Sequence, residues 1–219
     1  MKGYCPPPNN AATIALLRSH GWGILTSASY WKSHRMEQYE GMPLAIDNGA
    51  WGYYQRGEPF DEDAFIECLE ILHKHAKWYV LPDVVAGGLD SLALSLRWLD
   101  KLAWAHAEPY LAVQDGMTPE HLEGRPLHIF VGGTTEYKLE TMGAWANYAH
   151  QHNKMCHVGR VNTRKRMEWC FACDVDSFDG SGIVRFPHKA ARTVRWLDDI
   201  RRREQAPPIR GPVPERWRG

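Results

Sequence analysis

The residues Leu44–Trp51 read LAIDNGAW, a short apolar run that stops at Asp47-Asn48-Gly49. Short apolar runs bounded by turn-forming residues are typical of buried β-strands. The polar end of the run matters because the carboxyl ends of parallel strands meet on one face of a barrel. This stretch therefore predicts a buried strand that carries a carboxylate to that face.

Similar apolar runs alternate with longer helical stretches along the whole chain. The predicted strands are Gly23–Thr26, Leu44–Asp47, Trp78–Leu81, Tyr110–Gln114, His128–Val131, Met155–Val158, Val175–Phe178 and a more doubtful Ile183–Phe186. The predicted helices are Asp61–Ala76, Leu89–Ala107, Thr135–His152 and Thr163–Cys173. Regular alternation of this kind indicates an α/β protein with a parallel sheet. Eight units favour a compact (β/α)8 TIM-type barrel with a trimmed or irregular last unit, and fewer units would favour an open sheet.

The chain predicts one domain over residues 1–205. The first ten residues, which include Pro6-Pro7-Pro8, are interpreted as an extended lead-in. Residues 206–219 are rich in Pro and Arg and lack an apolar period, so we expect a flexible tail.

Composition limits the kinds of partner. The chain has 26 basic and 26 acidic residues, which argues against a protein that coats nucleic acid nonspecifically. A local basic stretch, RVNTRKR at 160–166, fits either a solvated helix face or a contact with phosphate groups. No apolar run reaches the length of a membrane span and no leader segment is recognisable, so we expect no membrane partner and a cytoplasmic location (the host cytoplasm for a viral protein).

Four clustered residues raise the question of zinc. Cys170 and Cys173 form a C-x-x-C pair, and Cys156 with His157 precedes it. Met167, Cys170 and Phe171 nevertheless follow the spacing of a helix face that packs on a core. Core packing is the favoured interpretation, so we expect no cofactor and no metal, with zinc as the alternative.

Polar residues and glycines follow six of the predicted strands and should converge on one rim. They are Asp47-Asn48-Gly49, Pro82-Asp83, Gln114-Asp115-Gly116, Gly132-Gly133, Gly159-Arg160 and Asp179-Gly180. Asp and Gly also favour ordinary turns, but agreement at six strand ends indicates a functional site. Glycines let a flat ligand approach the backbone, Asp and Gln can bind the edge of a purine, and Trp51 offers a stacking surface.

These motifs resemble those of the tRNA-guanine transglycosylase family. Asp47–Trp51, DNGAW, is similar to the family's D-S-G-G-F run, and Asp174–Asp179, DVDSFD, is similar to its G-V-D-M-F-D run. Val113–Gly116 is similar to its V-Q-G-G stretch, and Gly132-Gly133 to its next glycine pair. The order and approximate spacing match from about Gly23 to Pro187.

The resemblance also has gaps. No cysteine follows Cys173, whereas the family has a zinc motif beyond its nucleophile, and Gly180-Ser181-Gly182 replaces its P-T-R. A C-terminal RNA-binding module is also missing. What remains resembles the reduced relatives encoded by bacteriophages, which insert 7-deazaguanine bases such as preQ0 into DNA. The resemblance thus implies a nucleic-acid partner, with DNA favoured over tRNA.

The resemblance assigns roles to named residues. It implies that Asp179 is the nucleophile, and we expect Asp47 to be the general acid or base. The base would be bound by Asp83, Gln114, Gly132, Gly133, Trp51 and His157. The nucleic-acid backbone would be bound by Arg160, Arg164, Lys165 and Arg166. For His157 and Arg160 a structural role is an equal alternative. Exchange with retention requires the carboxyl groups of Asp47 and Asp179 to lie about 5–9 Å apart.

Other functions remain open at this point. The same scaffold would suit a transglycosylase acting on tRNA, or a glycosidase that releases the base to water. A non-catalytic subunit that binds nucleic acid is an alternative of another class, although it would not need both Asp47 and Asp179. A metal-dependent barrel hydrolase that uses rim Asp and His residues is the last alternative.

Overall fold

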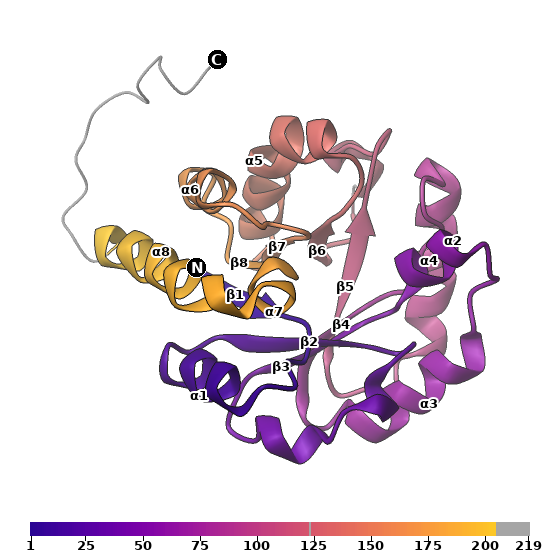
Figure 1. Ribbon diagram of the computed structural model, residues 1–219. Coiled ribbons are helices and arrows are strands. Elements are labelled where there is room, and N and C mark those ends of the chain that lie inside the picture. The colour runs from indigo at the N-terminus through magenta and orange to yellow at the C-terminus, as the bar shows by residue number, and fades with distance from the viewer. Residues whose placement is uncertain (123, 205–219) are drawn as a thin grey trace.

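The computed structural model describes residues 1–122 and 124–204, which form a closed barrel of parallel strands in sequential order (Figure 1). The strands are β1 Lys2–Cys5, β2 Gly23–Ser27, β3 Leu44–Asp47, β4 Ala76–Val80, β5 Glu108–Val113, β6 His128–Val131, β7 Cys156–Val158 and β8 Ser177–Asp179. Closure is made by β1, which pairs with β2 on one side and with β8 on the other. The predicted (β/α)8 fold is confirmed. The predicted tail, 206–219, lies outside the described residues.

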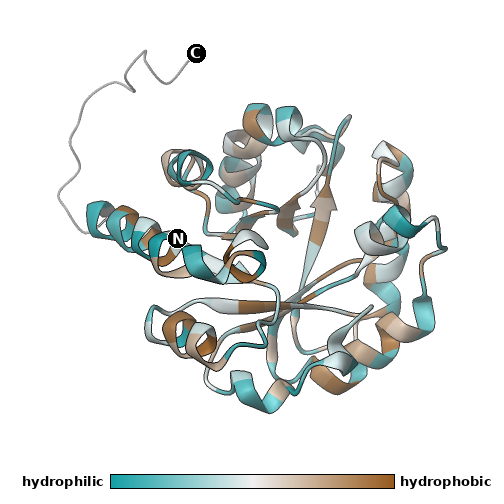
Figure 2. Ribbon diagram, in the orientation of Figure 1, coloured by the Kyte–Doolittle hydropathy of each residue, from teal (hydrophilic) through white to brown (hydrophobic). Residues whose placement is uncertain are grey.

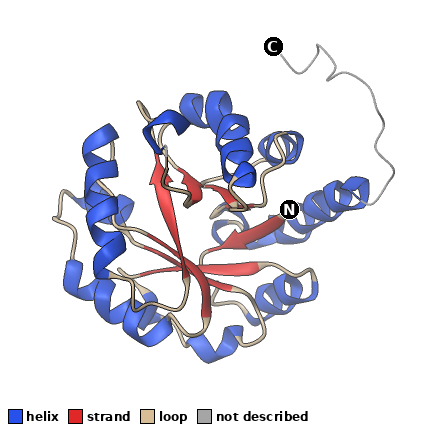
Figure 3. Cartoon of the chain, turned by 180° about the vertical axis from the view of Figure 1, so that it is seen from behind, coloured by secondary structure: helices blue, strands red, loops and turns tan. Residues whose placement is uncertain are grey.

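Helices surround the strands, as the view from behind shows (Figure 3). The α-helices are α1 Ala11–Ser19, α2 Ala50–Arg56, α3 Glu62–Leu72, α4 Gly88–Lys101, α5 Thr135–Gln151, α6 Arg164–Ala172, α7 Gly182–Arg185 and α8 Ala190–Glu204. Side-chain caps start several of them: Asp61 accepts a hydrogen bond from the Ala64 amide, and Thr134 accepts one from Tyr137. In the described residues no helix is both long and apolar enough to span a bilayer.

Two strand connections explain how a short chain completes the barrel. Between β2 and β3 the described chain has only the 3₁₀ helices η1 Trp31–Ser33 and η2 Met36–Tyr39. Between β5 and β6 it has the 3₁₀ helix η3 Pro119–Leu122. A further short one, η4 Pro187–Lys189, precedes α8. Replacing helices by such turns saves residues without opening the sheet. The shortened connections are the second and the fifth, rather than the last unit that the prediction named.

Two of the predicted segments need correction, one lead-in and one strand. The lead-in predicted at the N-terminus is in part strand β1, a four-residue strand that the following prolines hide from pattern analysis. Ile183–Phe186, the doubtful last strand, falls instead on the helical turn α7, in which the Arg185 amide donates to the Ser181 carbonyl. Asp47 and Asp179 therefore end β3 and β8, the third and eighth strands, rather than the second and seventh.

Aromatic side chains fill the barrel interior. Tyr4, Trp78, Tyr110 and Phe130 belong to a compact cluster, in which Trp78 stacks on Tyr110 with ring centroids 4.7 Å apart. The Trp78 indole also donates to the Tyr4 hydroxyl. A separate, larger core lies between strands and helices, and the apolar residues in Figure 2 concentrate on the strands and on parts of the surrounding helices. The aromatic cluster thus fills the barrel interior beneath the rim.

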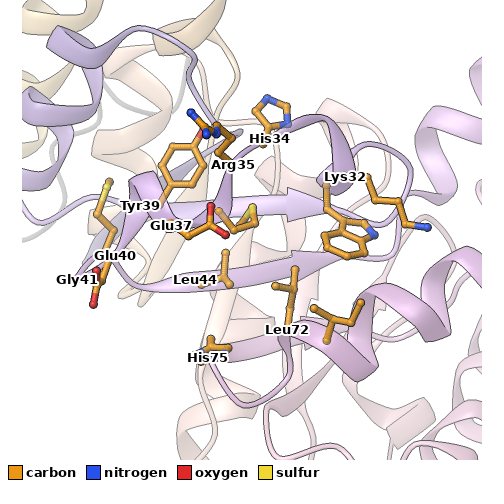
Figure 4. A pocket seen from close by; sticks show the side chains of 14 residues that line it. Lys32, His34, Arg35, Glu37, Tyr39, Glu40, Gly41, Leu44, Leu72 and His75 are labelled. Carbon is orange, nitrogen blue, oxygen red and sulfur yellow. The ribbon is translucent and has the colours of Figure 1, made fainter.

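A hollow lies on the flank of the barrel, away from the rim. It is a groove of about 990 Å³ where η1 and η2 stand in for a helix, and Trp31, Leu44 and Leu72 are part of its lining (Figure 4). Leu44 begins β3, whereas Asp47 ends it. None of the predicted site residues lines this groove, so it is not the site considered below.

Candidate active site

Asp47 and Asp179 are the last residues of β3 and β8, so the parallel barrel brings both to the same rim. Burial raises the pKa of Asp47 to about 7, and the Gly49 amide, which donates to Oδ1 at 2.7 Å, only partly opposes this. The negative charges of Asp179 and Asp83 raise the pKa further. Asp47 and Asp179 therefore interact electrostatically, and the predicted separation of about 5–9 Å stays a prediction.

Asp179 is held by donors on one of its oxygens. Oδ1 lies 3.2 Å from His157 Nε2 and accepts from the Arg160 amide at 3.3 Å. The side chain is nearly buried, which fixes its direction at the mouth of the barrel. A carboxylate oriented in this way can present its other oxygen to a ligand.

His157 has a different place from the one predicted. It is fully buried, stacks on Phe130 with centroids 4.9 Å apart, and lies 2.8 Å from the Ser177 hydroxyl through Nδ1. Burial lowers its pKa despite the opposing effect of Asp179, so the ring is neutral at pH 7. Because an ionised carboxylate only accepts, the Nε2–H donates to Asp179. Direct contact of His157 with a base is therefore corrected to a role in orienting Asp179.

Asp83 and Gln114 meet in a polar network on the neighbouring strand ends. Asn48 Nδ2 donates to Asp83 Oδ1 at 2.8 Å, and Gln114 Nε2 approaches Asp83 Oδ2 at 3.5 Å. Gln114 also donates to the Val84 carbonyl at 2.9 Å. Burial raises the pKa of Asp83 to about 6, and the bond from Asn48 opposes it. The structure therefore brings together both residues predicted to read the base edge, and Asn48 fixes one of them.

An exposed aromatic stack stands at the same mouth. Trp51 and Tyr54 on α2 stack with centroids 5.8 Å apart, and Trp51 is 43% exposed. The Arg160 guanidinium lies 4.5 Å from the centroid of the Trp51 ring. Large exposed aromatic faces are costly unless a ligand covers them, so this stack suits a base or a sugar.

The glycine pair Gly132-Gly133 contributes mainly backbone hydrogen bonds and a turn. The Gly132 amide donates to the Val113 carbonyl in the sheet, and the Gly133 carbonyl accepts from Arg160 Nη2 at 2.7 Å. Gly133 has φ +73°, and an added Cβ would lie 2.4 Å from Asp115 Oδ2. Asp115 in turn binds the amide and hydroxyl of Thr134. Glycine is therefore required here by the turn, and contact of Gly132 or Gly133 with a base stays a prediction.

The predicted basic residues separate into two groups. Arg164 pairs with Glu168 at 3.0 Å and with Asp199 at 3.8 Å, which ties α6 to α8. The Lys165 ammonium lies 4.8 Å from the Trp169 ring centroid. Arg166 contacts the Thr135 hydroxyl at the start of α5, and Arg160 lies at the mouth. Arg160 and Arg166 are thus the better placed pair for an anionic backbone.

Two residues of the site escaped the sequence analysis. Lys138 on α5 is buried and donates to the Gly159 carbonyl at 3.0 Å. Tyr30 follows β2, and burial together with the charges of Asp47 and Asp179 raises the pKa of its phenol. Neither follows an apolar run directly, and Lys138 has a glutamate two positions away on each side, which suggests a solvated face. No local signal identifies them, because their position depends on the closed barrel.

The four residues of the zinc alternative lie in the barrel core or pack against it, and the absence of a metal stays a prediction. Among residues 1–122 and 124–204 no group of three His, Cys, Asp or Glu side chains is arranged to hold a metal ion. Cys156 and Cys170 are fully buried, and Cys170 belongs to the main core, as the helical spacing predicts.

The chain was compared with protein-family models and with curated proteins. No family model and no curated protein matches it. The geometry of the rim and the motifs themselves therefore provide the basis for a functional proposal.

Proposed function

We propose that the protein is a base-exchange transglycosylase that replaces guanine in DNA with a 7-deazaguanine base through a covalent aspartyl-sugar intermediate. The observation that carries the proposal is the meeting of Asp47 and Asp179 on one rim, close enough for the charge of Asp179 to raise the pKa of Asp47. Enzymes that act at the C1′ carbon of a sugar commonly use two carboxyl groups whose different environments give them different pKa values.

The exchange follows as two displacements at C1′. An Asp179 carboxylate oxygen attacks C1′, the bond from C1′ to the guanine nitrogen breaks, and the proton of Asp47 passes to the leaving base. The incoming base then loses its ring N–H proton to the Asp47 carboxylate. Its nitrogen attacks C1′ and releases Asp179, so the configuration is retained. A pKa of about 7 suits Asp47 to both proton transfers at neutral pH.

Recognition of the base is assigned to Asp83 and Gln114. A carboxylate oxygen accepts from the N–H groups on the edge of a guanine-like ring, and the Asn48 amide keeps Asp83 oriented for this. Trp51 supplies a stacking face. The reacting nucleotide must leave a duplex to reach such a mouth, so single-stranded or flipped DNA is the expected substrate.

The test is capture of the covalent intermediate. Protein is incubated with single-stranded DNA and preQ0 carrying a radiolabel, and the products are separated under denaturing conditions. We expect label in DNA, a protein–DNA adduct, and loss of both by roughly a thousandfold or more in Asp179→Ala. Full exchange by Asp179→Ala would overturn the assignment.

A matched carboxylate serves as control. Asp115 lies on the same rim but is bound to Thr134, so Asp115→Asn should keep exchange activity. A parallel reaction with tRNA distinguishes the acceptor, and release of free guanine without incorporation would indicate a glycosidase. DNA binding with no chemistry on either acceptor would favour the non-catalytic subunit.

A further inference from the structure

Lys138 is unusual because a lysine is rarely enclosed to this degree. Only 6% of the residue is exposed, and its ammonium donates to the Gly159 carbonyl at 3.0 Å. A buried ammonium is costly unless it is paired with an opposite charge and hydrogen-bonded, so its presence here needs an explanation. The charges around it are Asp179 from β8, Asp115 from the loop after β5, Arg160 from the loop after β7, and Arg166 from α6. Cys170 on α6 also faces it, and burial keeps that thiol protonated by raising its pKa to about 12.

The Gly159–Arg160 peptide unit links Lys138 to the proposed nucleophile. The carbonyl of this unit accepts from Lys138, and its N–H, which belongs to Arg160, donates to Asp179 Oδ1 at 3.3 Å. Because the peptide unit is trans, its C=O and N–H groups point in opposite directions. The C=O faces the Lys138 ammonium, and the N–H faces the Asp179 carboxylate. Hydrogen bonds arranged in such a chain polarise one another.

The backbone at this unit is held in an uncommon conformation. Arg160 has φ +61°, in the left-handed region that favours glycine. Its side chain is fixed separately, by the Gly133 carbonyl and by Trp51. Gly159 has no room for a side chain, because an added Cβ would lie 2.9 Å from the Phe130 ring. Strained backbone of this kind persists where the surroundings hold it, which is common at functional sites.

We propose that Lys138 is a positioning residue of the transglycosylase, whose ammonium holds the Gly159–Arg160 peptide so that the Arg160 amide fixes the attacking carboxylate of Asp179. The inference rests on the proposed function. Lys138 does not contact the substrate in this proposal and acts on Asp179 through one peptide unit.

The charge state of Lys138 makes the proposal testable by pH. Burial lowers its pKa to about 8, with Arg160 and Arg166 acting in the same direction and Asp179 against it. The ammonium is therefore present below about pH 8 and is lost as the pH rises through that value. The Arg160 amide should lose its ordering over the same interval.

The first measurement needs no substrate. The ¹H–¹⁵N resonance of the Arg160 amide is followed from pH 6 to 10 in the wild-type chain and in Lys138→Met. We expect a wild-type transition near pH 8, and in the variant a constant shift with amide exchange about tenfold faster. A pH-independent wild-type amide would overturn the link, whatever the protein's activity. Lys77→Met, at an exposed lysine on β4, should leave the transition unchanged.

The second measurement separates positioning from folding. Lys138→Met should lower kcat for base exchange by about 10- to 100-fold with KM within about twofold, as expected for a misplaced nucleophile. Its melting temperature should change by no more than about 5 °C, because removal of a buried charge and loss of the hydrogen bond to Gly159 have opposite effects on stability. Lys138→Arg, which keeps the charge, should recover activity and lose the decline near pH 8. An unchanged kcat in Lys138→Met would overturn the proposal, whereas absence of exchange in the wild type with an intact amide transition would overturn only the transglycosylase function.

Discussion

At the scale of single residues, the rim shows two carboxyl groups with opposite effects on stability. The pKa of Asp47 rises from its usual 3.8 to about 7, mainly through burial. A raised pKa means that Asp47 stabilises the fold most when it is protonated, and this contribution is lost as the pH rises from about 4 through 7. Asp47→Asn keeps an oxygen for the Gly49 amide and removes the buried charge. At pH 8 we expect the variant to be more stable than the wild type by about 2 kcal/mol. The full pKa shift corresponds to at most about 4 kcal/mol, and the difference should vanish near pH 4. Urea unfolding at the two pH values measures this.

Asp115 provides the control of opposite sign. Burial alone would raise its pKa, but the hydroxyl and amide of Thr134 outweigh that effect and lower it. Asp115→Asn should therefore be less stable than the wild type at pH 7, and the loss should shrink as the pH falls below about 4. A stability change in Asp47→Asn that does not vary with pH would contradict the place given to its carboxyl group.

Residues that end a strand could be predicted from the sequence, and residues that a helix turns inward could not. Asp47, Asp83, Gln114 and Asp179 follow apolar runs, so their position on the rim comes directly from the strand pattern. Lys138 looks like part of a solvated face, and His157 looks accessible because it lies near the end of a predicted strand. Both side chains are buried by residues that lie far away in the chain. The strand or helix periodicity of a local stretch of sequence carries no information about such residues.

At the scale of elements, the start of α6 tests the predicted contact with nucleic acid. Arg160 and Arg166 lie toward the rim, whereas Arg164 is paired with Glu168 and Asp199. Arg160→Ala and Arg166→Ala should each weaken binding of single-stranded DNA and lower the slope of log Kd against log salt by about 0.7, the value for one phosphate contact. Fluorescence anisotropy between low and moderate salt measures the slope. Arg164→Ala should leave it unchanged, and equal slopes for all three variants and the wild type would remove the phosphate contact from the proposal.

Short elements were the hardest to predict. The strands Leu44–Asp47 and His128–Val131 begin and end at the predicted residues. Turn-forming residues close to each strand in the sequence mark these ends. The run Ile183–Phe186 has strand-forming residues, yet the Asn162 carboxamide accepts from the Gly182 amide and starts a helical turn instead. A single side-chain cap from a distant loop thus overrides local preference over so few residues.

At the scale of the whole molecule, closure of the barrel depends on the segment that the sequence presents as a lead-in. Strand β1 pairs with both β2 and β8, and the Gly180 amide donates to the Tyr4 carbonyl beside Asp179. Tyr4 also accepts from Trp78 in the interior, and Arg201 on α8 donates to the Met1 carbonyl, near the N-terminus shown beside α8 in Figure 1. Without β1 the barrel has two unpaired edges and an open interior.

Removal of residues 1–5 should therefore abolish the cooperative fold rather than trim a loose end. We expect the truncated chain to lose its near-ultraviolet circular dichroism and its sharp calorimetric transition, because two sheet edges would be left unpaired and the interior aromatic cluster exposed. Tyr4→Phe keeps the strand and removes only the acceptor for Trp78, so it should stay folded and lose about 1–3 kcal/mol. A truncated chain that still melts cooperatively at the wild-type temperature would mean that β8 and β2 hold the rim without β1. In that case Asp179, which ends β8, could not owe its place on the same rim as Asp47 to closure of the barrel.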